Sequence, residues 1–90
     1  MQSSNFKTAY PPIGVYEHYK STPEDPKLYQ VLAIAQHTET DEKFVVYIPL
    51  YTVPEHTGLR VRVRPLEMFV ETVSINGKTV PRFHYVGTEL

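Results

Sequence analysis

The side chains of this 90-residue sequence that are best suited to acid–base chemistry are His18 and His37, each close to a Tyr, Lys or Glu. Histidine changes charge near neutral pH, so either residue could act as an acid, a base or a pH switch. No Cys, no His-x-His pair and no cluster of carboxylates accompanies them, so the ligand spacing of a zinc site is absent. We favour the alternative interpretation, in which each histidine is half-buried and donates a hydrogen bond to a backbone carbonyl.

Nucleophilic catalysis has less support, because no serine of the sequence stands in a Gly-x-Ser-x-Gly elbow. The only aspartates, Asp25 and Asp41, fall in predicted loops, and four glycines are too few for a loop that cradles phosphate. We therefore predict no catalytic residues, no metal and no cofactor. A non-enzymatic protein is favoured over a small acid–base enzyme that uses His18 or His37.

Arginine recurs at every second position between residues 60 and 64, which places three guanidinium groups on one face of an expected strand over residues 59–64. The residues that alternate with them are apolar, and we predict that this apolar face turns inward. The apolar face consists of Leu59, Val61 and Val63. With cations of the closing hairpin, the arginines could form a basic stripe for single-stranded RNA, a phosphorylated ligand or an acidic peptide. The stripe consists of Arg60, Arg62, Arg64, Lys78 and Arg82.

A second interpretation of the arginines is an edge strand that charges protect against aggregation, and we favour it for Arg60 and Arg62. For Arg64, a bond to Glu67 or a turn carbonyl and a contact with a ligand remain equally open. Tyrosines form a further candidate group, because their rings can line a groove while a hydroxyl reaches solvent. For each of them, however, a place in the core is favoured. They are Tyr16, Tyr19, Tyr29, Tyr47, Tyr51 and Tyr85.

The composition is that of a small folded protein, with 41% hydrophobic and 12% aromatic residues. A formal net charge of −1 gives no general argument for nucleic acid or an anionic membrane. The absence of Cys fits a reducing compartment, and no apolar run approaches the roughly 20 residues that cross a bilayer. Residues 1–8 are polar and unlike a signal peptide. We therefore expect a cytoplasmic protein without a membrane partner.

The order of apolar runs and turn residues predicts an all-β domain over residues 13–90, after a flexible lead-in over residues 1–12. The expected architecture is a strongly bent sheet or small barrel of five to six strands. A single helical turn is expected over residues 65–69, where it would close one end of the barrel. The expected strands cover residues 13–20, 28–36, 44–51, 59–64, 70–75 and 78–86, and a helix is the competing interpretation for 28–36.

Asn76-Gly77 is the sequence of a two-residue type I′ turn, because both central residues of that turn need a positive φ. The resulting register pairs Ile75 with Lys78 and Val73 with Val80. The same register, continued outward, predicts an ion pair between Glu71 and Arg82 and places Val70 opposite Phe83.

Several separate blocks of the sequence, in the same order, resemble one bacterial family, the domains of unknown function 1653. The blocks are YEHYK at 16–20, YQVLAIAQHTET at 29–40, VVY at 45–47, LY at 50–51, VRPLEMF at 63–69 and VPRF at 80–83. The resemblance covers roughly residues 13–86 and implies an SH3-like β-barrel. It implies no activity, because the family has none assigned.

The sequence departs from the family pattern at three places. Residues 21–27 are an insertion, Arg62 stands where the family often has Trp, and the segment around Arg60 and Arg62 is longer. A ligand surface built on that Trp would be altered in this protein.

The leading functional hypothesis is a binding or adaptor module with a polar and aromatic groove between the block at 64–69 and the strands that carry the histidines. Its partner would be a protein, a peptide or a small anionic ligand, and the oligomeric state stays open. The expected ligand-binding residues are His18, His37, Tyr47, Arg64, Glu67 and Arg82. The alternative is a barrel that binds RNA or a phosphate ligand through the basic stripe, with Arg60, Arg62 and Lys78 taking part.

Overall fold

The structure is a computed structural model and describes residues 10–55 and 58–89. Most of the lead-in predicted for residues 1–12 therefore lies outside the described residues. Within these ranges no helix is long and apolar enough to cross a membrane. The elements are β1 (Gly14–His18), β2 (Leu28–Gln36), β3 (Lys43–Pro49), β4 (Arg62–Pro65), α1 (Leu66–Phe69), β5 (Thr72–Ile75), β6 (Lys78–Pro81) and β7 (Phe83–Gly87).

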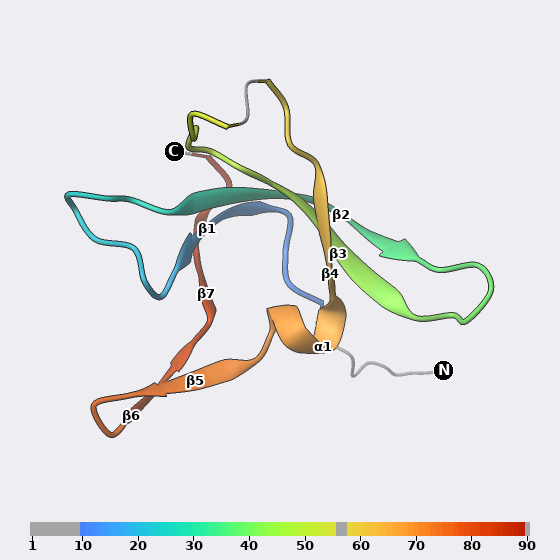
Figure 1. Cartoon of the computed structure of the whole chain (residues 1–90). Helices are drawn as coiled ribbons and strands as arrows, with labels where there is room; N and C mark the ends of the chain where they lie inside the picture. The colour runs from blue at the N-terminus through green and yellow to red at the C-terminus, as the bar shows by residue number, and fades with distance from the viewer. Residues whose placement is uncertain (1–9, 56–57, 90) are drawn as a thin grey trace.

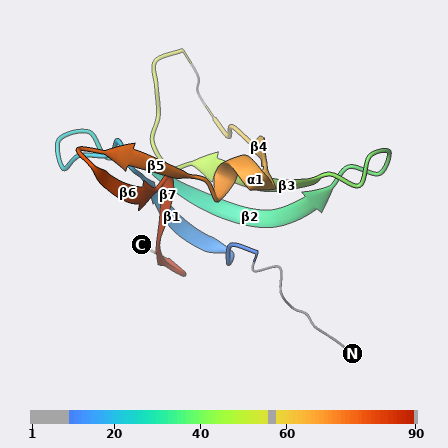
Figure 2. The same cartoon turned by 90° about the horizontal axis from the view of Figure 1, so that it is seen from below.

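Five strands form one antiparallel sheet in the order β4-β3-β2-β1-β7, and β5 pairs with β6 in a separate hairpin. The hairpin projects away from the sheet, and α1 lies between it and β4 (Figure 1). Seen from below, α1 lies against β3 and β4 (Figure 2). The predicted β class is thus confirmed. No closed barrel is detected among the described strands.

Some predicted strand boundaries are confirmed, whereas the strand predicted over 59–64 begins only at Arg62 and includes Pro65, and those predicted over 13–20 and 70–75 are shorter. β2 has the predicted bounds 28–36, and β3 ends at Pro49, which lacks the backbone donor that a further ladder bond would need. The predicted helical turn forms over Leu66–Phe69, but Pro65, predicted as its first residue, is instead its N-cap and the last residue of β4. In contrast, the strand predicted over 78–86 is divided at Arg82 into β6 and β7.

The β5–β6 hairpin has the predicted turn and register. Asn76 and Gly77 have φ values of 52° and 79°, as a type I′ turn requires. Ile75 pairs with Lys78 and Val73 with Val80. At its open end, the Arg82 guanidinium donates to Glu71 at 3.1 Å, which confirms the predicted ion pair.

The predicted pairing of Val70 with Phe83 is wrong. The paired strands of the hairpin end at Thr72 and Pro81, and one further backbone hydrogen bond, from the Arg82 N–H to the Glu71 carbonyl at 3.0 Å, closes the hairpin. Beyond Arg82 the chain joins the edge of the sheet, and Phe83 pairs with His18 of β1 instead. The bend therefore carries the last strand from the hairpin to the first strand of the sheet.

The core lies on the inner face of the sheet, the face toward α1, and is dominated by aromatic rings. Phe69 of α1 is 2% exposed, and its ring stacks on Phe83 with centroids 4.4 Å apart and planes 3° from parallel. Tyr16 and Tyr47 pack on Phe69 at 5.3 and 5.8 Å. The buried cluster consists of Tyr16, Tyr29, Val31, Val45, Tyr47, Phe69 and Phe83.

The faces of β4 are inverted relative to the prediction, since the apolar residues point outward. Leu59, Val61 and Val63 are 75%, 56% and 59% exposed. Arg64 lies opposite the buried Val45, and Arg62 lies opposite the buried Tyr47, so both arginines are on the inner face. The aromatic rings already fill that face. Only long side chains that lie across the rings, with their charged ends near water, can therefore occupy this edge.

The stacking of Phe69 predicts that α1 depends on this one side chain. A Phe69→Ala substitution should destabilise the fold by about 3–5 kcal/mol, because it leaves a cavity against Phe83. Met68→Ala is the matched control: Met68 is exposed on the same helix, and its truncation should cost within about 0.5 kcal/mol. Urea unfolding followed by tyrosine fluorescence measures both values. Equal costs for the two variants would contradict the proposed packing.

Candidate functional site

His18 is the last residue of β1, and local backbone contacts fix its ring. Its Nδ1 accepts a hydrogen bond from the Lys20 backbone N–H at 3.1 Å, which leaves the proton of the neutral ring on Nε2. The loop over residues 21–27, which the resemblance implied to be an insertion, closes directly on His18. The His18 N–H donates to the Lys27 carbonyl at 3.0 Å, and the Ser21 N–H donates to the His18 carbonyl at 2.9 Å.

Aromatic rings and cations surround this imidazole. It lies 5.1 Å from the Phe83 ring and 4.7 Å from the Tyr19 ring. Burial lowers the pKa of His18, and the positive charges of Arg82, Arg64 and Lys20 lower it further. We call His18, Lys20, Arg64 and Arg82 the cationic cluster. The charges of its two guanidinium groups, those of Arg64 and Arg82, both act on the His18 imidazole.

Arg64 reaches this cluster across the aromatic core. Its guanidinium carbon lies 5.6 Å from the centroid of the Phe83 ring, within the range of a cation–π interaction. Its Nε donates to the Tyr47 hydroxyl at 3.4 Å, a long hydrogen bond. One alternative left open by the sequence was a bond from Arg64 to Glu67. Among the described residues, no such bond is found. Within the described ranges the other guanidinium donors of Arg64 have no hydrogen-bond partner, so they are available to a ligand.

Arg82 joins three parts of the fold at the bend between β6 and β7. Its backbone N–H donates to the Glu71 carbonyl, and its carbonyl accepts from the Tyr19 N–H, both at 3.0 Å. Its guanidinium pairs with Glu71, and the side chain is 25% exposed. The buried Arg82 Nε–H finds no hydrogen-bond partner within the part of the chain that the structure describes. A buried donor without a partner is costly, so an acceptor at this position would stabilise the site.

A hollow of about 350 Å³ opens beside His18, between the end of β1 and the bend. Glu17 and His84 pair directly across β1 and β7 and line it with His18. The Ser21 hydroxyl also lines the hollow, where it accepts a hydrogen bond from the Lys27 N–H at 2.8 Å. Within the described ranges, no group of three or more His, Asp or Glu is arranged to hold a metal ion.

The structure brings four of the six expected ligand-binding residues together, namely His18, Tyr47, Arg64 and Arg82, all next to or in contact with Phe83. It places His37 elsewhere. His18 donates to the residue just before β2, whereas His37 follows its last residue. The nine residues of β2 separate the two histidines by about 30 Å along the strand.

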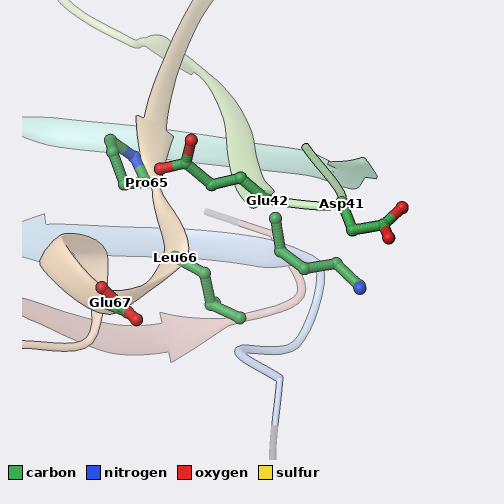
Figure 3. Close-up of a pocket in the computed structure, with 6 residues that line it drawn as sticks. Asp41, Glu42, Pro65, Leu66 and Glu67 are labelled. Atoms are coloured by element: carbon green, nitrogen blue, oxygen red, sulfur yellow. The ribbon is translucent and has the colours of Figure 1, made fainter. Parts of the chain in front are cut away.

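Glu67 also lies away from the cationic cluster, in a second hollow of about 450 Å³. Figure 3 shows Asp41 and Glu42 of the β2–β3 turn on one side of this hollow and Pro65, Leu66 and Glu67 on the other. His37 belongs to the same turn, where its backbone N–H donates to the Glu42 carbonyl at 2.8 Å. Thus a single groove lined by all six expected residues does not form.

The basic stripe is divided in the same way. Arg60 donates to the Tyr51 carbonyl at 2.8 Å, and its guanidinium lies 5.3 Å from the Tyr51 ring. Lys27 lies 4.9 Å from the same ring, so two cations flank one tyrosine. Arg62 is exposed on the inner face of β4. Lys78 lies beside the hairpin turn and takes no part in this row of cations.

Most of the tyrosines serve the core. Burial, assisted by the hydrogen bond of 2.8 Å to the Tyr51 hydroxyl, raises the pKa of Tyr29 far above its ordinary value. Burial and the neighbouring Tyr85 raise the pKa of Tyr16 to about 12. Both hydroxyls therefore stay protonated at neutral pH, and neither is poised as a base.

Some contributors to this site were not expected from the sequence. Lys20 is two residues from His18, a predicted site residue, and its positive charge could have indicated that it belongs to the site. Phe83 gave no signal, because its role depends on the pairing of β1 with β7, which are far apart in the sequence. Lys27 is the last residue of the implied insertion at 21–27, and nothing local indicated that it would reach Tyr51.

The fold and this geometry define a small β-rich domain with hydrogen-bond donors gathered over an aromatic core. The family model described as "Protein of unknown function (DUF1653)" matches residues 14–85. A crystal structure of a DUF1653 protein from Bordetella bronchiseptica is similar, with 41% identity, coverage of 84% of this chain and 87% of that one, and a TM-score of 0.68. No curated protein matches. The chain therefore belongs to the DUF1653 family, as the sequence blocks implied.

The lowered pKa of His18 predicts a loss of stability in acid. Below about pH 6.5 the unfolded chain takes up a proton at this residue while the folded protein still resists it, so folding weakens as the pH falls. His18→Asn, which retains an acceptor near the Nδ1 position, should lose less stability than the wild type between pH 7.5 and 5.5. Urea unfolding at both pH values measures this difference.

The matched control is His37→Asn, because the exposed His37 makes the same local bond, accepting at Nδ1 from the Glu39 N–H at 3.1 Å. Between pH 7.5 and 5.5 this variant should lose as much stability as the wild type, since His18 is unchanged. If His18→Asn loses as much stability on acidification as the wild type, then His18 does not contribute to that loss.

Proposed function

We propose that this domain is a non-enzymatic binding module whose cationic cluster receives an anionic group of its partner. The observation that carries the proposal is that His18 and the Arg64 guanidinium lie 5.1 and 5.6 Å from the same Phe83 ring, next to Arg82, whose carbonyl accepts from the Tyr19 N–H. Guanidinium groups suit carboxylate and phosphate oxygens, because they present several N–H donors in a fixed plane.

The hydrogen-bonding capacity of the cluster supports an acceptor as ligand. Among the described residues, Arg64 makes only one long side-chain bond, and the Arg82 Nε–H has no partner. The neutral His18 ring adds an Nε2–H donor, because its other nitrogen already accepts from Lys20. An anion placed among these groups would satisfy donors that the protein itself leaves open.

An acid–base enzyme is less well supported. Of the polar groups beside His18, Ser21 already accepts a backbone hydrogen bond, and Arg82 is paired with Glu71. The neighbouring positive charges also disfavour the protonated form of His18, which an acid catalyst would need.

Single-stranded nucleic acid is the second candidate, and one observation favours it: Lys27 and Arg60 flank the Tyr51 ring. However, base stacking needs exposed ring faces, and Tyr29, Tyr47 and Phe83 are buried. We therefore place a protein or peptide partner first.

The proposal includes an SH3-like arrangement of the strands, the fold type that the family resemblance implied. Its support is the pairing of β1 with both β2 and β7, which makes the first and last strands neighbours. In addition, Phe69 covers the inner face of the sheet, as the expected closing turn would.

Titration with inorganic phosphate tests the proposed anion site. At constant ionic strength, phosphate should shift the NMR signals of His18, Lys20 and the Arg82 side-chain Nε–H more than chloride does. Arg64→Gln should weaken phosphate binding by about tenfold, because it removes a charge-assisted hydrogen bond.

Lys78→Gln is the matched control, since it removes one positive charge from the hairpin, away from the cluster. Its phosphate affinity should equal that of the wild type. Shifts scattered over all basic residues, or equal losses in both variants, would mean that the cluster is not a site.

A further inference from the structure

With respect to the described residues, the edge of the sheet at β4 is open along its backbone. β4 is the terminal strand of the sheet, and its single sheet neighbour is β3. In the described ranges, no backbone hydrogen bond outside the β3 ladder involves residues 58–64. A free row of N–H and C=O groups is a template onto which an extended segment can add as a further strand.

The two faces of this edge differ sharply in chemistry. On the outer face, Val63 lies opposite Val46, which in turn lies opposite Ala33, so an apolar row crosses three strands and ends at the edge. Val63 is exposed at the end of that row, and Val61 precedes it. On the inner face the edge carries the guanidinium groups of Arg62 and Arg64.

Natural edge strands usually carry charges or bulges that discourage a partner. At β4 both arginines are on the inner face, where Arg64 lies over Phe83, so the outward face stays apolar. Pro65 closes only the last position of the strand. The edge therefore has the features of a docking strand.

A second copy of this chain is a poor occupant. Pairing β4 with β4 of another copy would bring the Arg62 and Arg64 side chains of both copies onto one face of the joined sheet. Like charges opposite each other across strands are destabilising. A segment with acidic residues at every second position places opposite charges there instead, and its intervening residues would continue the apolar row of Val63.

We propose that β4 binds an extended peptide segment of alternating acidic and apolar residues by strand addition. The acidic side chains lie over Arg62 and Arg64, and the apolar side chains lie beside Val61 and Val63. Because Arg64 belongs to the cationic cluster, this inference rests on the proposed function and names the class of partner.

The probe is a blocked synthetic peptide of seven residues in which Val and Glu alternate. It should bind, shift the amide signals of residues 61–64 and slow their hydrogen exchange. A peptide of the same composition with the four Val and three Glu in separate blocks should bind at least about fivefold more weakly, because only alternation matches both faces. Two further peptides carry N-methyl groups either at the odd-numbered or at the even-numbered positions. One of them should lose binding and the other should keep it, since successive N–H groups point to opposite edges of a strand.

Two pairs of variants separate the faces of the edge. Val63→Thr keeps a β-branched side chain but should weaken binding about threefold, whereas Val86→Thr, an equally conservative change at an exposed residue of the opposite edge strand β7, should not. Arg62→Gln should weaken binding by about threefold or more, whereas Lys78→Gln should not.

The outcomes distinguish this inference from the proposed function. Phosphate binding at the cationic cluster without peptide binding would overturn strand addition and keep the anion site. Equal binding of the alternating and block peptides, or indifference to N-methylation at every position, would also overturn it. Binding of an oligouridylate at the same edge in place of the peptide, or dimerisation through β4 in sedimentation, would replace the proposed occupant.

Discussion

Phe83 lies where the chain leaves the β5–β6 hairpin and joins the sheet, and the arrangement around it depends on this ring. It pairs with His18 through the backbone and stacks on Phe69 at 4.4 Å. The rings of Tyr29 and Tyr47 pack on it at 5.4 and 6.0 Å. Without this ring, α1 would lose its stacking partner and the guanidinium of Arg64 would lose its platform. The same contact thus holds the first strand, the last strand and the helix together.

An inner face filled with rings has a consequence for charge. Side chains at the rim cannot enter the core, so the long basic ones lie across the rings and keep their charged ends near water. Arg64 on Phe83, and Lys27 and Arg60 on Tyr51, all follow this rule. The packing of the core therefore gathers cations along one rim although the whole chain has a net charge of −1. It also leaves the valines at the β4 edge facing outward.

Local features were predictable from the sequence, and long-range ones were not. Asn76-Gly77 determined the hairpin register because the turn itself demands positive φ at both residues. The alternation in residues 59–64 predicted a strand, which forms from Arg62 on, but its prediction of an inward apolar face was wrong, because the aromatic rings already fill the inner face at this edge. The meeting of His18 with Arg82 depends on the β1–β7 pairing, which joins residues more than sixty positions apart. The separation of His37 and Glu67 from His18 follows from the length of β2.

The central claim is that the Arg64 side chain lies on the inner face, over Phe83, while Val63 faces solvent. NMR tests it directly, because the Cδ protons of an arginine held over a ring are shifted upfield by the ring current. We expect such a shift at Arg64, contacts from these protons to the Phe83 ring, and strong relaxation of the Val63 methyl groups by a soluble paramagnetic probe. An unshifted Arg64 together with Val63 methyl groups in contact with Phe83 or Tyr47 would contradict the account.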